Sequence, residues 1–209
     1  LFDIITFVGK HLKNKDGVRL IKTCKRFTKI WKSYRHTEII TLSHIPNVIP
    51  IYWTYKFIIK SCNNDIITNI STIAKHTPIN LTLLNCDDVT DVAALGSVHT
   101  LTLHKCKNIT DVSTLGAVHT LTLYNCEKVT DVSALGTVHT LVLHNCSNIV
   151  DVSALRTVHT LTLHNCSNIV DVAALGTVHT LTLHNCPKIT DVAALGTVHT
   201  LTLFRCDIT

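Results

Sequence analysis

DVSALGTVHTLVLHNCSNIV, residues 131–150, is followed directly by DVSALRTVHTLTLHNCSNIV, residues 151–170. Further units of the same period align with these without a gap, and the six units begin at Asp91, Asp111, Asp131, Asp151, Asp171 and Asp191, the last of them cut short at Thr209. A fixed period of this length is typical of solenoids, because one unit cannot bury its apolar face alone and must stack on its neighbours. The period therefore decides the architecture before local propensities are considered.

Within each unit the apolar residues follow the pattern of a short strand and a return path. In the coil that opens the series they are Val98, Leu101, Leu103, Cys106, Ile109, Val112 and Leu115. The two leucines alternate with polar residues, as in a strand with one buried face. The spacing L-x-x-L-x-L-x-x-C resembles the leucine-rich repeat and recurs over residues 79–209. The resemblance implies an α/β solenoid with one parallel strand per coil and short 3₁₀ or helical turns on its convex side.

The return path of each coil is short. Asp91-Val-Ala-Ala-Leu-Gly96 is long enough for a single helical or 3₁₀ turn, with the aspartate expected as N-cap and the glycine just after the turn. In one coil Arg156 replaces the glycine, and we expect it to strain or expose the turn there.

Cysteine use also follows the period. Seven of the nine cysteines occupy one position of the repeat, and they are Cys86, Cys106, Cys126, Cys146, Cys166, Cys186 and Cys206. A residue used once per coil between apolar positions is more simply a small buried side chain than half of a disulfide. We therefore expect free thiols and a cytoplasmic or nuclear protein, since disulfides are rare in those reducing compartments.

A histidine recurs at the start of each strand, at His99, His119, His139, His159, His179 and His199. Stacked neighbours about 5 Å apart resist being charged together, which predicts a hydrogen-bonded ladder of neutral rings. Metal binding is the alternative, but no C-x-x-C is present, and His144 is expected to face outward where Cys146 faces inward. We expect no metal and no cofactor.

The outward strand face is the candidate binding surface, because the inward face is committed to packing. Departures from its usual Thr, Thr, His, Asn are residue types that serve as contact anchors. The candidate set, departures included, is Thr102, His104, Lys105, Thr122, Tyr124, Val142, His144, Thr162, His164, Thr182, His184, Phe204 and Arg205. No acid–base pair, activated nucleophile or glycine-rich phosphate loop is apparent in the sequence, so we expect a binding protein and not an enzyme.

Residues 1–36 have a helical period instead. The run from Asp3-Ile4-Ile5 to Cys24-Lys25-Arg26-Phe27 resembles an F-box, although Phe2 stands where that family has proline. The resemblance covers about one fifth of the chain. It implies that this segment binds the Skp-type adaptor of a cullin-RING (SCF) ubiquitin ligase while the solenoid holds a protein substrate. The implied adaptor-binding residues are Leu1, Ile4, Ile5, Val8, Leu12, Val18, Leu20 and Cys24. The alternative is a plain interaction solenoid with a helical cap.

Residues 37–78 are expected to be degenerate capping repeats, since Phe57, Ile59 and Cys62 reproduce the strand spacing. About four extra residues precede Leu81. The solenoid of residues 79–209 has no C-terminal cap, which suggests a fragment of a longer protein. Richness in Ile, Asn, Thr and Lys suggests an A/T-rich genome, and because large DNA viruses carry many F-box and repeat proteins, a viral protein acting in a host cell is expected.

Two other functions remain as alternatives, and no membrane partner is expected because no apolar run is long enough to cross a bilayer. Residues 1–62 carry twelve Lys and Arg against three Asp and Glu, which leaves nucleic-acid binding open, but the basic residues lack interleaved aromatics for stacking. The Thr-x-Thr strands resemble the arrays of ice-binding solenoids, but Val142 interrupts them.

Overall fold

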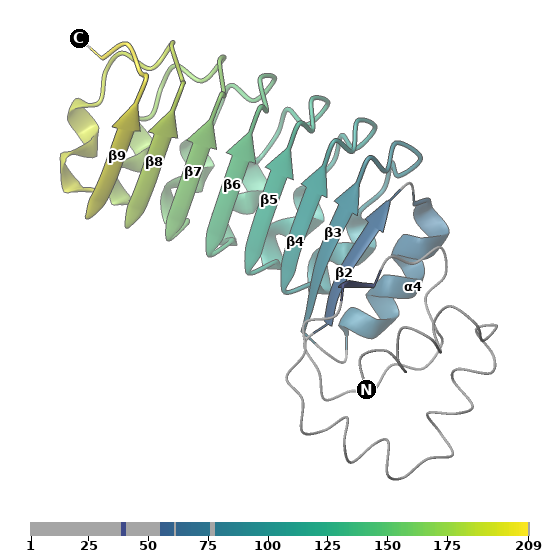
Figure 1. Ribbon diagram of the computed structural model, residues 1–209. Helices are drawn as coiled ribbons and strands as arrows, with labels where there is room; N and C mark the ends of the chain where they lie inside the picture. The colour runs from purple at the N-terminus through teal and green to yellow at the C-terminus, as the bar shows by residue number, and fades with distance from the viewer. Residues whose placement is uncertain (1–38, 41–54, 61, 76–77, 209) are drawn as a thin grey trace, which may run out of the picture.

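The strands form one parallel sheet that follows the order of the chain. The computed structural model describes residues 39–40, 55–60, 62–75 and 78–208. In this part of the chain each strand pairs with the strands before and after it (Figure 1). The nine strands are β1 (Ile39–Ile40), β2 (Tyr55–Lys60), β3 (Ile79–Leu84), β4 (Thr100–His104), β5 (Thr120–Tyr124), β6 (Thr140–His144), β7 (Thr160–His164), β8 (Thr180–His184) and β9 (Thr200–Phe204).

Successive coils are in register at every strand position. Leu101 pairs with Leu121, Leu103 pairs with Leu123, and the same 20-residue offset holds from β3 to β9. Because this offset equals the sequence period, equivalent side chains stack in rows that cross the sheet. From β3 to β8 the two central leucines of each strand are buried, and the residues between them are half-buried on the other face. The chain thus folds as the predicted leucine-rich-repeat solenoid.

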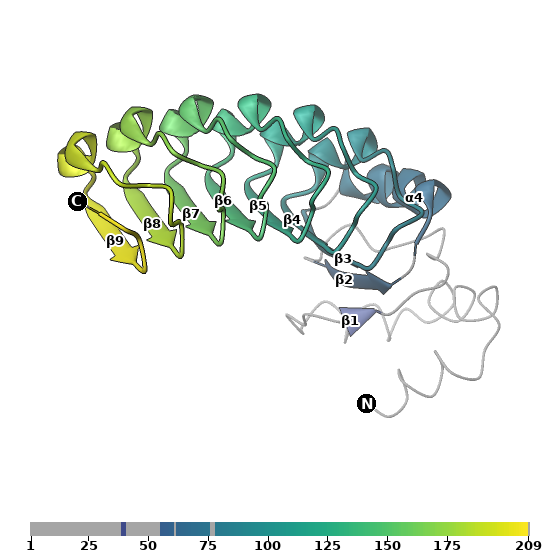
Figure 2. The same cartoon turned by 90° about the horizontal axis from the view of Figure 1, so that it is seen from above.

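Short 3₁₀ helices carry each coil back to the start of the next strand. They are η1 (Ala93–Ser97), η2 (Ser113–Ala117), η3 (Ser133–Thr137), η4 (Ser153–Thr157), η5 (Ala173–Thr177) and η6 (Ala193–Thr197). Figure 2 shows the coils as an arc, with these turns on the outer side and the strands on the inner side. The sheet therefore forms the concave face, as the resemblance implied.

The aspartate stabilises each turn, but one residue earlier than predicted. Asp91 Oδ1 accepts a hydrogen bond of 2.7 Å from the backbone N–H of Ala93, and the bond recurs in all six coils at 2.7–2.9 Å. The N-cap position itself belongs to Val92. In the coils that have serine two residues on, the backbone N–H and the serine hydroxyl lower the pKa of Asp111, Asp131 and Asp151.

The glycine lies inside the 3₁₀ helix and has no left-handed conformation, so its predicted role as a helix terminator is wrong. Its role is to allow close approach between coils. A Cβ on Gly136 would lie 2.4 Å from the carbonyl oxygen of Ala154 in the next coil. A Cβ added to Gly96, Gly116 or Gly176 would lie 2.4–2.6 Å from the equivalent carbonyl oxygen, whereas one added to Gly196 in the last coil would have no neighbour within 4 Å. Arg156 is exposed, as expected.

In the described part of the chain the repeat cysteines are reduced, and all but Cys206 are buried, as predicted. All eight cysteines among the described residues are free thiols, and those from Cys62 to Cys186 are buried. From Cys106 to Cys206, each Sγ donates to the carbonyl of the second strand leucine in the preceding coil, at 3.5–3.8 Å. Burial raises the pKa of Cys146 to about 11 and that of Cys126 and Cys166 to about 12. These thiols pack as apolar side chains and are not poised for reaction.

The N-terminal side of the repeats has a different coil. Phe57 pairs with Leu81 and Ile59 with Leu83, so this coil is 24 residues long. The extra length forms α4 (Asn64–Ala74), which replaces a 3₁₀ turn and packs against η1. The buried residues of α4 include Ile67 and Ile70, which extend the core of the solenoid at this end. The division of the chain at residues 36 and 78 stays a prediction.

Candidate functional site

Six planar side chains form a continuous stack across the concave face. We call them the aromatic row, and they are His104, Tyr124, His144, His164, His184 and Phe204. Neighbouring ring centroids are 4.0–4.7 Å apart, and the planes differ by 6–21°. The sequence interpretation treated Tyr124 and Phe204 as departures from a histidine surface, but both belong to the stack. A planar side chain at the same position of six coils was the signal that this interpretation missed.

The threonine row lies beside the aromatic row on the same face. Thr102, Thr122, Thr162 and Thr182 are half-buried, and Val142 takes the same position in β6. The structure thus brings these predicted residues together with the aromatic row on one continuous surface. Because the rings are covered by one another, this surface presents ring edges and hydroxyl groups to solvent.

Two predicted residues lie just beyond the strands. Lys105 and Arg205 follow β4 and β9 directly, with φ of 54° and 52°. The equivalent residues of the other coils are asparagines with φ of 51–54°, at Asn85, Asn125, Asn145, Asn165 and Asn185. Asparagine is common here because its short side chain tolerates the left-handed region. Lys105 and Arg205 therefore occupy the edge of the concave face and not its strands.

The asparagines also join the coils. Asn165 Nδ2 donates to Asn145 Oδ1 at 2.7 Å, and Asn185 Nδ2 donates to Asn165 Oδ1 at 2.7 Å. This amide row runs parallel to the aromatic row, one residue further along the chain. The predicted outward asparagine therefore has a structural role in the second half of the solenoid.

Charge on the concave face has one sign. Strands β3 to β9 contain no charged residue. The position of the aromatic row continues in register to Leu84 and then to Lys60, which is exposed. At the other end the Arg205 guanidinium lies 5.2 Å from the centroid of Phe204. With Lys105, these residues place three cationic groups around strands β3 to β9, which are themselves uncharged.

Two imidazoles near the middle of the aromatic row, His144 and His164, are disfavoured from taking up a proton. The Nδ1 atoms of His104, His144, His164 and His184 are buried and have no hydrogen-bond partner among the described residues. Burial lowers the pKa of His144 and His164, and the neighbouring imidazoles lower it further. The backbone carbonyl of each of these two residues raises the pKa of its own imidazole, but by less than the other effects lower it. Nε2 is left as the ring nitrogen through which each imidazole meets a partner.

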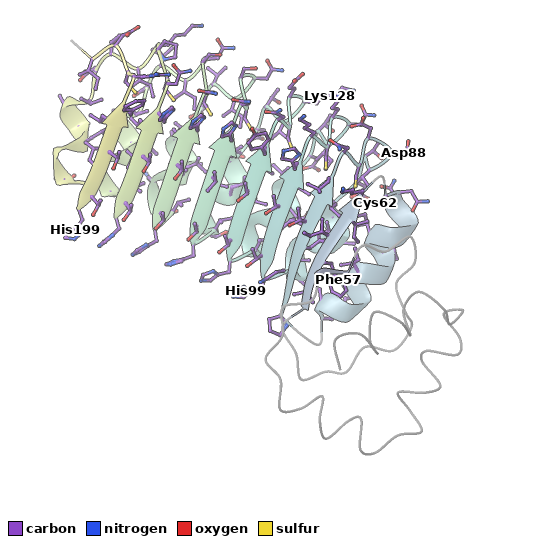
Figure 3. All side chains as sticks on the ribbon, in the orientation of Figure 1. Phe57, Cys62, Asp88, His99, Lys128 and His199 are labelled. Atoms are coloured by element: carbon purple, nitrogen blue, oxygen red, sulfur yellow. The ribbon has the colours of Figure 1, made fainter. Side chains whose placement is uncertain are left out.

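A second stack of histidines lies at the edge where the strands begin. These rim histidines are His99, His119, His139, His159, His179 and His199, with centroids 4.5–4.8 Å apart. Figure 3 shows His99 and His199 on this edge, with Asp88 and Lys128 on the opposite one. Four of the rings lie 3.2–3.3 Å, through Nδ1, from the following threonine hydroxyl. Burial and the neighbouring rings lower the pKa of His159. The predicted hydrogen-bonded ladder is thus present.

The replacement of glycine by Arg156 coincides with a hollow on this edge. Arg156, Thr157 and Val158 line it together with His159, Thr177 and His179, and its volume is about 540 Å³. The sides are open and no carboxylate lines it. We find nothing in its lining that selects a ligand.

The described residues contain no group of three or more His, Cys, Asp or Glu side chains placed to hold a metal ion. No helix in the described part of the chain is long and apolar enough to cross a membrane. The predicted adaptor-binding residues, Leu1 to Cys24, lie outside the described residues.

Comparison with known proteins yields a distant structural likeness. No protein-family model matches the chain, and no curated protein has a matching sequence. Among solved structures, the chain is similar to an internalin from Listeria monocytogenes strain 4b F2365, with 21% identity and a TM-score of 0.49. The likeness covers 76% of this chain and 50% of the internalin chain, so this chain spans about half the length of its neighbour. A likeness of this size says nothing about what either protein binds.

Proposed function

We propose that this chain is a protein-binding scaffold that holds its target on the concave face. The supporting observation is the surface formed by the aromatic row and the threonine row, which the fold leaves free. Its backbone is fixed by strand pairing on both sides from β3 to β8, so the surface is rigid before a partner arrives. Preorganisation of this kind lowers the entropic cost of binding.

The finer proposal is that the scaffold is the substrate-recognition subunit of an SCF-type ubiquitin ligase, acting in the cytoplasm or nucleus, and in a host cell if the protein is viral. It rests on the resemblance of residues 1–36 to an F-box, followed by leucine-rich repeats. In this role residues such as Ile5 and Leu20 bind the Skp-type adaptor, and the chain performs no chemistry of its own.

Adaptor binding is tested by co-purification of the full chain with a recombinant Skp-type adaptor. The double variant Ile5→Asp and Leu20→Asp is expected to lose the adaptor, because buried charge opposes an apolar contact. The matched control, Lys13→Glu and Lys22→Glu, changes charge without touching the apolar positions and is expected to retain it. Wild-type chain that never co-purifies with the adaptor contradicts the ligase proposal and leaves the scaffold proposal standing.

The binding face is tested with a photo-crosslinking amino acid introduced at one position at a time. At Thr162 on the concave face it is expected to capture a target protein from cells. At Ala134, exposed on the convex turn η3, it is expected to capture none of that target. Equal capture at both positions would exclude the concave face as the specific surface.

A further inference from the structure

The concave face has a charge pattern that selects one kind of partner. Among the side chains that the structure describes on this face and at its edge, the fixed charges are Lys60, Lys105 and Arg205, and strands β3 to β9 carry no carboxylate. The acidic residues nearest in sequence lie in the turns after the strands, at Asp87, Asp88, Glu127 and Asp207. The Asp87 carboxylate is hydrogen-bonded within its turn, since its Oδ1 accepts a bond of 3.3 Å from the backbone N–H of Lys107. A negatively charged partner therefore meets no like charge on the strands themselves.

The aromatic row adds titratable groups to this pattern. Four of its six members are imidazoles, and Tyr124 is the remaining ionisable side chain of the row. His144, His164 and His184 are consecutive, with ring centroids 4.1 Å apart. Stacking covers the faces of these rings, so a partner reaches their edges. In a protonated imidazole Nε2 always carries a hydrogen, which a carboxylate at the ring edge accepts.

We propose that the concave face binds an acidic, carboxylate-rich protein segment, and that the imidazoles of the aromatic row take up protons when it binds. This inference rests on the proposed scaffold function and gives its target a chemical class. In the free protein, burial and neighbouring rings oppose charging of His144 and His164, whose rings are stacked 4.1 Å apart. Carboxylates placed along the row offset that opposition, so the bound state holds more protons than the free state. By linkage, affinity then rises as the pH falls.

A nucleic acid is the competing anionic partner, and the geometry disfavours it. Single strands bind by stacking bases on exposed aromatic faces. The inner rings of the aromatic row already have neighbours on both faces at 4.0–4.7 Å. Outer faces remain only at the ends of the row, and at one end Arg205 already lies over Phe204. Ring edges that donate hydrogen bonds suit carboxylates better than they suit bases.

The test is a titration of the full chain against a fluorescent peptide of about ten glutamates, followed by anisotropy at constant ionic strength. Lowering the pH from about 7.5 to about 6, where glutamate stays ionised, is expected to tighten binding about tenfold, the effect of one proton taken up. A glutamine peptide of equal length is expected not to bind. Affinity that does not change with pH, or tighter binding of an oligonucleotide of equal charge, overturns the proposal.

Matched variants assign the effect to the aromatic row. His144→Gln, His164→Gln and His184→Gln together are expected to abolish the pH dependence. His139→Gln, His159→Gln and His179→Gln remove the same number of stacked rings from the rim histidines and are expected to preserve it. The reverse pattern contradicts the proposal. Circular dichroism at each pH checks that the chain stays folded.

A fixed charge provides a readout that does not depend on acid conditions. His164→Lys supplies at about pH 7.5 the charge that protonation supplies at lower pH, and it is expected to tighten glutamate-peptide binding several-fold. Unchanged or weaker binding counts against the proposal even if the wild-type chain unfolds in acid. If the crosslinker at Thr162 captures a target but glutamate-peptide binding does not change with pH, this inference is wrong and the proposed scaffold function stands.

Discussion

The residue that follows each strand is chosen by backbone conformation as much as by exposure. Seven positions from Asn85 to Arg205 have φ of 51–54°, and five of them are asparagine. Left-handed backbone costs an ordinary L-residue about 1 kcal/mol, and asparagine suffers less because its side chain bonds locally. At Asn165 a second role is added, since its amide both donates to Asn145 and accepts from Asn185. These side chains therefore stabilise the edge of the binding face.

Asn165→Ala is expected to lower the free energy of unfolding by about 1–3 kcal/mol, because both amide contacts are lost and alanine fits the left-handed region less well. Lys105→Ala is the matched control. It has the same φ but no side-chain hydrogen bond in the structure, and it is expected to change stability by less than about 0.5 kcal/mol. Denaturant unfolding measures both values, and equal losses would show that the amide row contributes nothing.

At the scale of the element, the 3₁₀ turns are fixed by contacts between coils. In the four turns that end in threonine, the hydroxyl donates to a carbonyl of the turn before it, as Thr157 Oγ1 does to the Gly136 carbonyl at 2.7 Å. At Gly96, Gly116, Gly136 and Gly176, an added Cβ would lie only 2.4–2.6 Å from a carbonyl oxygen of the next coil. The spacing between turns on the convex side is therefore as tightly set as the strand spacing on the concave side.

Gly136→Ala is expected to cost about 1–3 kcal/mol of stability, because the new Cβ would lie 2.4 Å from the Ala154 carbonyl oxygen. Gly196→Ala adds the same methyl group where no atom lies within 4 Å, and it is expected to be neutral or to stabilise by up to about 1 kcal/mol. Thermal unfolding of the two variants checks this contrast. Similar losses in both would mean that the close approach is not what selects glycine.

The sequence predicted those elements whose form depends on the period alone. Leu101, Leu103, Cys106 and their equivalents in the other complete coils point inward, because a fixed 20-residue offset places equivalent residues in one row. The role of Gly136 was not predictable, since it depends on the distance to a carbonyl in another coil. The same holds for the aromatic row. Its members were found one by one, but their stacking follows from a strand spacing that no single coil contains.

For the whole molecule, three histidines of the two stacks link stability to pH. The pKa values of His144, His159 and His164 are lowered in the folded chain by loss of hydration and by the neighbouring imidazoles. The unfolded chain, in which these groups titrate near their ordinary value of about 6.5, binds more protons in acid. The contribution of these groups to stability is therefore complete above about pH 6.5 and is lost as the pH falls through the folded-state values.

The melting temperature is expected to fall as the pH is lowered from about 7.5 to about 5.5, because protonation favours the unfolded chain. A variant with glutamine at His144, His159 and His164 is expected to show a shallower dependence over this range. Calorimetry on both proteins provides the measurement. An equal slope in the variant would mean that other groups, such as the carboxylates of the turns, set the acid response.

The uniform register has a consequence for how such a protein changes its size. Every coil from Asp111 to Val170 presents nearly the same contacts to the coil before it and the coil after it. Gain or loss of one complete unit by recombination joins surfaces that already fit, so no new interface has to evolve. The concave surface can therefore lengthen or shorten by one coil at a time, and the aromatic row and the threonine row stay continuous.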